Sequence, residues 1–266
     1  MVTQEQDLDG APLAARGAVK SAYRTVEVLE ALSRSGGGCS LSELQRQLRV
    51  PKSSLHELLQ TLVSIGWVEV DLRTTTYRIG LRALRVGTAY LDSDPLVRAA
   101  GPLLAQLRNE MDETVHLARL DGSDVVYLIS HESSHHVRVI SRIARRLPAH
   151  STALGKILLA MRSYDEVTAL LPSRLEKLTP ATVVDRAELE VEMEKARELG
   201  YSSETGQNTP GLVCFAVAVP GHHPSTDSVS CSMPLTRLND EHAARVIGGL
   251  TSCADQLGQL VRSNGW

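Results

Sequence analysis

A short run of basic and hydroxyl side chains lies just after a proline and could bind a polyanion. It consists of Lys52, Ser53, Ser54 and His56. Pro51 precedes the run, and because proline suits the first position of a helix, we expect these side chains at a helix start. Free backbone N–H groups and the positive end of the helix dipole attract phosphate there, while short side chains let the helix approach base edges. The pattern favours recognition of a nucleic acid groove.

Two helices separated by a tight turn are expected to position this run. Ser40 and Glu43 have the spacing of a capping box, which predicts a short first helix. Its apolar residues fall near helical spacing and are Leu41, Leu44 and Leu48. The second helix is expected over residues 51–65, with a buried stripe of Leu55, Leu58, Leu59, Leu62 and Ile65. The basic and hydroxyl side chains, together with Gln60, are left on its other face.

A two-stranded hairpin is expected after these helices. Its apolar residues alternate with polar neighbours around a turn at residues 71–76, and they are Val68, Val70, Tyr77 and Ile79. Arg73 is near the tip, where it suits contact with a DNA backbone or minor groove. Helix, turn, helix and hairpin in this order predict a winged helix-turn-helix. The candidate DNA-binding residues are Ser40, Lys52, Ser53, Ser54, His56, Glu57, Gln60, Arg73 and Thr75.

The distribution of charge supports this interpretation. The whole chain has a net charge of −3, but residues 16–85 contain 11 Lys and Arg against 6 Asp and Glu, a net charge of +5. Residues 86–266 contain 17 against 22, a net charge of −5. Basic charge concentrated in the helix-turn-helix segment indicates a nucleic acid partner. Two alternatives stay open, because the same fold can dock a protein and serines at a helix start can be only caps.

Length and composition limit the class of protein. A chain of 266 residues suggests two domains with buried cores. No stretch approaches ~20 apolar residues, so no membrane span is expected, and the first residues lack the basic start and apolar core of a secretory signal. Four scattered cysteines without a CxxC pair fit reduced thiols. We therefore expect a cytoplasmic protein with a mobile tail over residues 1–17.

The expected domains are a winged helix-turn-helix over residues 18–80, a connecting helix over 81–93 and an α+β domain over 94–263. A further helix over residues 18–32 should pack beneath the two motif helices. In the α+β domain we expect helices over residues 96–111, 152–161, 164–171, 186–199 and 240–261. We expect strands over residues 114–120, 125–130, 137–143, 212–219 and 228–233. This order predicts a sheet with helices packed against it.

Several longer motifs occur in a fixed order along the chain. PKSSLHELLQTL is followed by GWVE, YRIG ends the hairpin, and LPAHSTALGKILLA lies in the second half. ETGQNTPGLVCFAVAV is then followed by SVSCSMPLTR. With these motifs the sequence resembles the IclR family of bacterial transcriptional regulators over residues 18–261. The resemblance implies a winged helix-turn-helix joined to a GAF-like effector-binding domain, assembled as a dimer or a dimer of dimers, with an operator in double-stranded DNA and a small-molecule effector as partners.

By this resemblance the effector pocket lies between the sheet and a helix that begins near Thr152. Ser230 and Ser232 alternate along a strand, so both hydroxyls face one side, and free N–H groups at the helix start would bind a carboxylate. A small organic acid or aromatic compound is expected, although Glu204 opposes an anion unless it is protonated or meets a ligand hydroxyl. The matching positions are Val139, Thr152, Ala153, Leu154, Gly155, Glu204, Cys214, Ser230 and Ser232. The alternative is that the serine hydroxyls only form hydrogen bonds with backbone groups and that Cys214 only packs in the core.

Three residues depart from the family pattern. Glu57 stands where the family often has arginine; an acid disfavours nearby phosphate but can accept a hydrogen bond from a cytosine amino group. Ala218 stands where the family has proline, and Met233 where it has glycine before Pro234. Both are expected beside the pocket, so they affect its shape.

Other chemistries have weaker support. Residues 153–156 only superficially resemble a phosphate-binding loop, because a second glycine and a following hydroxyl are missing, and Lys156 is expected on the helix surface. Ser151 beside His150 cannot act as nucleophile and base, and there is no GxSxG. The loop histidines lack acidic or thiol partners at ligand spacing, and they are His131, His135, His136, His222 and His223. We expect no metal, no cofactor and no catalysis; an enzyme that uses the pocket is the least favoured alternative.

Overall fold

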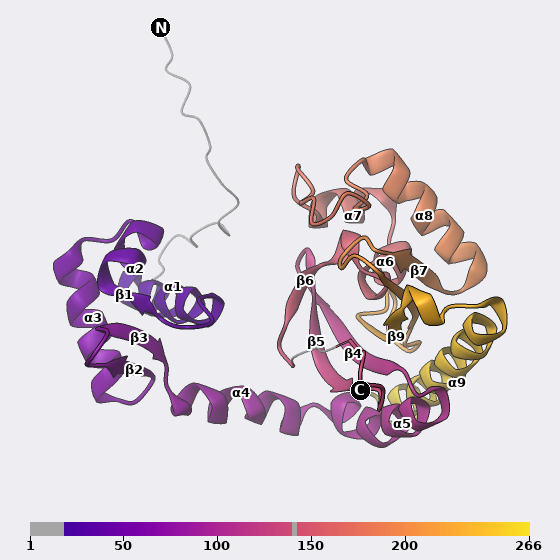
Figure 1. Ribbon diagram of the computed structural model, residues 1–266, viewed down its shortest axis with the longest axis horizontal. Helices are drawn as coiled ribbons and strands as arrows, with labels where there is room; N and C mark the ends of the chain where they lie inside the picture. Colours follow the sequence, from indigo (N-terminus) through magenta and orange to yellow (C-terminus); the bar gives the residue numbers. More distant parts are fainter. Residues whose placement is uncertain (1–18, 140–142) are drawn as a thin grey trace, which may run out of the picture. The chain divides into compact units, whose positions relative to one another are not determined.

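The computed structural model describes residues 19–139 and 143–266 (Figure 1). The tail expected over residues 1–17 lies outside this range. Contacts divide the chain into two compact units between Tyr90 and Leu91. In the part of the chain that the structure describes, no helix combines the length and apolar character needed to cross a bilayer.

The N-terminal unit is the expected winged helix-turn-helix. It contains α1 (Lys20–Arg34), β1 (Cys39–Ser40), α2 (Leu41–Leu48), α3 (Lys52–Ser64), β2 (Val68–Asp71) and β3 (Thr76–Ile79). The strands form an antiparallel sheet in the order β1-β3-β2. The predicted capping box starts α2, since the Ser40 N–H donates to the Glu43 carboxylate at 2.8 Å and the Glu43 N–H donates to Ser40 Oγ at 3.3 Å. Arg49 ends α2 with a left-handed φ of 52°, which turns the chain toward α3.

One apolar cluster fixes the three helices against the hairpin. Val28 of α1, Leu44 of α2, and Leu55 and Leu59 of α3 are buried in it. The buried stripe of α3 was therefore predicted correctly for Leu55, Leu59 and Leu62, whereas Leu58 is only half-buried. Ile65 is 44% exposed, because α3 ends one residue earlier and the chain leaves the helical register there.

The expected connecting helix is present as α4 (Leu81–Ser93). It runs without interruption across the division between the two units. All of its residues are exposed or half-buried in the single chain. Its exposed large apolar side chains are Leu81, Leu84, Val86 and Tyr90.

The C-terminal unit is an α+β sandwich around one antiparallel sheet. Its helices are α5 (Pro95–Met111), α6 (Ala153–Ala160), α7 (Tyr164–Leu170), α8 (Arg186–Leu199) and α9 (Asp240–Asn264), with short 3-10 turns η1 (Ala149–Ser151) and η2 (Leu235–Arg237). Its strands are β4 (Thr114–Asp121), β5 (Asp124–His131), β6 (Arg146–Pro148), β7 (Ser202–Thr205), β8 (Leu212–Ala218) and β9 (Asp227–Pro234). The strand order is β6-β5-β4-β9-β8-β7. Helices α5 and α9 pack on one face of the sheet, and α6, with α8 beside it, packs on the other (Figure 1).

Alternation along β4 separates the two faces of this sheet. Val115 and Leu117 are buried among the α5 and α9 side chains. Ala118 belongs to the cluster around α6, and His116 faces the same side. His116 is therefore a polar residue on a buried face of the sheet, which has an apolar layer of helices on each side.

One expected strand is wrong, and three strands were missed, which are β1, β6 and β7. Residues 137–139 are not a strand and Ile143 lies in a turn, while residues 140–142 lie outside the described residues. The edge strand is β6 instead, and it begins after Ala144 turns the chain with a φ of 64°. The other two missed strands, β1 and β7, have no apolar alternation to reveal them.

Candidate nucleic-acid interface and ligand cavity

The N-terminus of α3 is uncapped and open. Pro51 occupies the N-cap position and supplies no capping side chain, so the first N–H groups of a 13-residue helix stay available. The six candidate side chains of α3 are all exposed, and they are Lys52, Ser53, Ser54, His56, Glu57 and Gln60. The serines of this helix start are therefore not its caps, which removes the alternative that they serve only to begin the helix.

The turn between β2 and β3 presents the remaining expected residues of the wing. Arg73 and Thr75 are both exposed. The turn is fixed by Asp71, whose carboxylate accepts the Arg73 N–H at 2.8 Å. This hydrogen bond lowers the pKa of Asp71, which stays ionised at neutral pH. Ser40 differs from these residues, because its hydroxyl already serves the capping box of α2.

A small cavity lies in the C-terminal unit between the sheet and the start of α6. Its volume is about 30 Å³. Eight of the nine expected pocket positions line it, and they are Val139, Thr152, Ala153, Leu154, Glu204, Cys214, Ser230 and Ser232. Sequence reasoning missed seven further lining residues, which are His116, Tyr127, Arg145, Leu147, Asn208, Thr209 and Leu212. The structure thus brings together residues from distant segments of the chain.

Gly155 does not line the cavity, but it determines where α6 begins. The Thr152 Oγ1 caps α6 by accepting the Gly155 N–H at 3.0 Å. A Cβ atom on Gly155 would lie 2.2 Å from the Ala149 carbonyl oxygen. The absence of a side chain lets the first turn of α6 press against η1, and Ala153 and Leu154 of this turn line the cavity.

The carboxylate and thiol of the cavity wall lie on neighbouring strands. Glu204 of β7 pairs with Cys214 of β8, which pairs with Ser232 of β9. The Cys214 Sγ lies 3.1 Å from the Ser232 Oγ. Burial raises the pKa of Glu204, while the Gln207 N–H, which donates to its Oε2 at 2.8 Å, opposes the rise. A raised pKa weakens the repulsion that Glu204 would exert on an anionic ligand.

His116 is the most unusual of the missed residues. It is 1% exposed, and its ring packs against Tyr127 with 4.8 Å between the ring centroids. Burial, assisted by the charges of Arg145 and His131, lowers the pKa of His116 to about 3, so the ring is neutral at pH 7. One sequence signal could have found it: a histidine placed between apolar neighbours in an expected strand.

Lys156 is buried, which corrects its expected position on a helix surface. All eight residues of α6 are buried, because the helix lies between the sheet and α8 and has no solvent face. The Lys156 ammonium pairs with Glu192 of α8 and donates to Gln207 Oε1 at 2.6 Å. Since Gln207 in turn binds Glu204, this lysine fixes one wall of the cavity.

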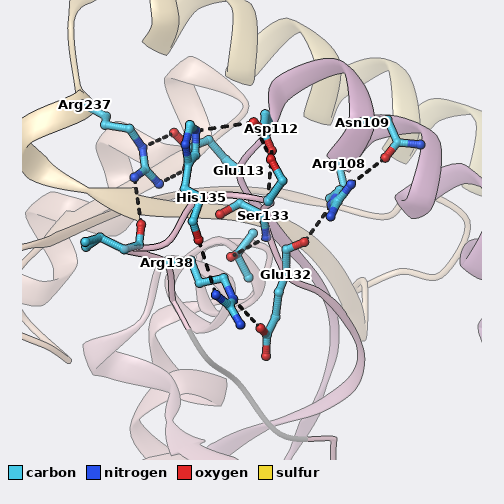
Figure 2. Close-up of polar contacts among 12 residues, drawn as sticks. Arg108, Asn109, Asp112, Glu113, Glu132, Ser133, His135, Arg138 and Arg237 are labelled. Carbon is cyan, nitrogen blue, oxygen red and sulfur yellow. Dashed lines mark hydrogen bonds and ion pairs between the residues drawn. The ribbon is translucent and has the colours of Figure 1, made fainter.

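A second polar network fastens the segment that leads to Val139. Arg237 forms a two-pronged ion pair with Glu113, which is 2% exposed, and also donates to the Val137 carbonyl at 2.9 Å (Figure 2). The Thr114 hydroxyl donates to the Val139 carbonyl at 3.1 Å. The backbone on this side of the cavity is therefore bound to the start of β4 and to η2.

Both units match models of known families. Residues 21–72 match the IclR helix-turn-helix domain, and residues 88–259 match the C-terminal domain of the bacterial transcriptional regulator IclR. The second match alone covers more than half of the chain. The chain belongs to the IclR family.

Relatives and solved structures agree with this family. The chain is 33% identical to the transcriptional repressor IclR of Escherichia coli over 231 residues, which cover 85% of this chain and 84% of the relative. It has the fold of an IclR transcriptional regulator from Alicyclobacillus acidocaldarius, with a TM-score of 0.82, 24% identity and coverage of 91% and 98% of the two chains. An IclR homologue from Microbacterium hydrocarbonoxydans, complexed with 4-hydroxybenzoate, gives a TM-score of 0.74, 22% identity and coverage of 90% and 99%.

Membership of the IclR family makes the protein a DNA-binding transcriptional regulator with an effector domain, and not an enzyme. The prediction from the sequence is confirmed in this respect. The protein-docking and enzyme alternatives are no longer needed. In the described residues, no group of three or more His, Cys, Asp or Glu side chains is arranged to bind a metal.

The three departures from the IclR pattern lie in different surroundings. Glu57 is exposed on α3 beside the other candidate DNA contacts. Met233 is fully buried among the α5 and α9 side chains, on the opposite face of the sheet from the cavity. Ala218 packs at the edge of the cluster around α6 and does not line the cavity. The expectation that Ala218 and Met233 border the pocket is therefore wrong, because strand alternation turns Met233 away from Ser232.

Proposed function

We propose that the exposed face of α3 reads an operator in double-stranded DNA and that the Arg73–Thr75 turn contacts the backbone beside it. The observation that carries this proposal is the uncapped α3 N-terminus surrounded by Lys52, Ser53 and Ser54. Such a helix end combines free N–H donors with a positive dipole, which suits phosphate, and short side chains admit base edges. Ser40 is the weakest of the proposed contacts, since its hydroxyl is already engaged.

Replacing Lys52 by alanine tests this proposal. Loss of one phosphate contact should weaken DNA binding and make the slope of log affinity against log salt less negative by about 0.9. Fluorescence anisotropy with a genomic fragment selected for binding, measured across salt, gives the slope. The exposed Lys177, in the C-terminal unit, provides the matched control as Lys177→Ala. An unchanged slope for Lys52→Ala would show that this ammonium does not touch phosphate.

We propose that the cavity binds a small organic acid. The first N–H groups of α6, at Ala153 and Leu154, would bind its carboxylate, and Arg145 adds a positive charge to the same cavity. A volume of about 30 Å³ has room for only about two water-sized groups, so the cavity must widen even for a compact acid. The complex of the Microbacterium homologue supports an aromatic acid as the larger alternative, which would need a wider cavity. The raised pKa of Glu204 supports an acidic ligand as well.

We propose that a dimer, or a dimer of dimers, binds DNA. We also propose that each chain has three parts: the winged helix-turn-helix over residues 18–80, the connecting helix over residues 81–93 and the α+β effector domain over residues 94–263. The exposed apolar side chains of α4 support self-association, because a solvated helix with such residues gains by burying them. The continuity of α4 supports transmission of an effector signal, since a helix resists bending. An effector shifts promoter occupancy only if it binds the two states with different affinity.

Replacing Leu84 by lysine tests the role of α4. Leu84 is 62% exposed, so the variant should fold, but a charge in a buried contact between copies should shift the protein toward monomer. We expect a loss of about tenfold or more in self-association, measured by sedimentation equilibrium. Val191→Lys, at an apolar residue of α8 that is 64% exposed, is the control. Equal association of the Leu84 variant and the wild type would exclude this surface.

A further inference from the structure

Three polar side chains on the cavity face of the sheet lack hydrogen-bond partners. His116 lies opposite Ser130 of β5 and opposite Ser230 of β9, so the three form one row across neighbouring strands. Both ring nitrogens of His116 and both serine hydroxyls are buried and bonded to no described residue. Buried polar groups are nearly always paired, because an unpaired one destabilises the fold. Where such unpaired groups border a cavity, they indicate a place that a bound molecule completes.

Two members of this row face the cavity. His116 and Ser230 line it together with Ala153 and Leu154 of α6. His116 is 1% exposed and cannot turn to bulk water, because the ring of Tyr127 packs against it. The unpaired nitrogens and the start of α6 thus meet at one small cavity.

The protonation state of His116 limits what it can bind. The pKa of His116 is lowered to about 3, so the ring is neutral above pH 5. A neutral imidazole offers one N–H donor and one nitrogen acceptor. Two groups act on it by their charge, Arg145 and His131, and of these Arg145 is exposed and lines the cavity. Arg145 and the N–H groups at the start of α6 therefore suit a ligand carboxylate better than the neutral His116 imidazole does.

We infer that the His116 imidazole and the Ser230 hydroxyl form a second polar subsite, which binds an uncharged oxygen of the effector. The inference rests on the proposed function of the cavity. The matching ligand is a small acid that carries a hydroxyl or carbonyl oxygen besides its carboxylate. His116 is a specificity residue, because a ligand without this oxygen leaves the buried nitrogens unpaired.

Two pairs of acids, each differing by one hydroxyl, test the inference. The pairs are acetate with glycolate, and benzoate with 4-hydroxybenzoate. Calorimetric titration of the full chain should show, in at least one pair, that the hydroxylated acid binds about tenfold tighter. His116→Phe keeps the ring contact with Tyr127 and removes both nitrogens, so the preference should fall below about twofold. His116→Gln, which retains a donor and an acceptor, should restore part of it.

The thermal stability of the same variants separates ligand recognition from a structural role. Because His116→Phe removes unpaired buried groups, its melting temperature without acid should rise by about 2–4 °C. A structural histidine predicts a lower melting temperature instead. The exposed His222 serves as the control through His222→Phe, which should keep the hydroxyl preference.

Failure of the inference can be told from failure of the proposed function. Equal binding within both pairs, or a preference retained in His116→Phe, would overturn the subsite and leave the proposed function of the cavity intact. No binding of any of the four acids would contradict the proposed function of the cavity, and the subsite with it. DNA binding is measured separately, with the wild-type chain and without acid, across salt. Absence of salt-dependent DNA binding would contradict the proposed regulator and leave the calorimetric result interpretable.

Discussion

Gly155→Ala is expected to lower the free energy of unfolding of the C-terminal unit by about 3 kcal/mol or more. Alanine normally stabilises a helix relative to glycine by ~1 kcal/mol, so the expected sign is the reverse of the usual one. The reason is a close approach of backbone to backbone. The added Cβ would lie 2.2 Å from the oxygen and 2.3 Å from the Cα of Ala149. No side-chain rotation can relieve this overlap, because both partners are main chain.

The α6 helix has little freedom to move away from this overlap. Each of its eight residues is buried, and Lys156 ties it to α8 through Glu192. Any shift would also move the Thr152 cap and the N–H groups proposed to bind a carboxylate. Loss of ligand-induced stabilisation should therefore accompany the loss of stability.

Urea unfolding, followed by circular dichroism, measures this effect. Gly248→Ala is the matched control, because Gly248 is an exposed glycine of α9 with nothing within 4 Å of an added Cβ. That variant should gain about 0.5–1 kcal/mol. A Gly155→Ala protein as stable as the wild type would mean that α6 does not press on Ala149 as described.

The DNA-binding half was predictable because its signals are local. The capping box at Ser40, the proline at 51 and the apolar spacing from Leu55 to Leu62 each act within a few residues. Such signals specify helix starts and buried faces without knowledge of tertiary contacts. The same holds for α8, which Asp185 caps and which Gly200 ends with a φ of 76°.

The cavity was only partly predictable because its walls come from segments far apart in the chain. Eight lining residues were predicted from the resemblance to the IclR family. A family resemblance carries information on tertiary structure that hydrophobic periodicity along the sequence does not contain. His116 and Arg145 lie on elements whose contacts no local pattern reports. Lys156 was wrongly expected on the surface for the same reason. A lysine in a short helix is usually exposed, and only the tertiary structure shows that a second helix covers it.

Arg237→Met is expected to lower the free energy of unfolding by about 3 kcal/mol. The variant leaves the Glu113 carboxylate buried without its two-pronged partner, and it also removes the donor to the Val137 carbonyl. The loss lies at the lower end of the range for broken buried pairs, because the Arg237 side chain is 24% exposed and water can partly replace it. Arg34→Met, which breaks an exposed pair with Glu30, is the control and should barely change the urea midpoint.

A double variant separates the buried charge from the lost packing. In Glu113→Gln with Arg237→Met, the neutral amide no longer carries an unpaired charge, and His242, whose Nε2 lies 3.4 Å from Glu113 Oε1, can still contact it. The double variant should therefore be more stable than Arg237→Met alone by about 1–2 kcal/mol, a non-additive result. With Glu113→Gln measured as the second single variant, additive losses would show that the two side chains contribute independently.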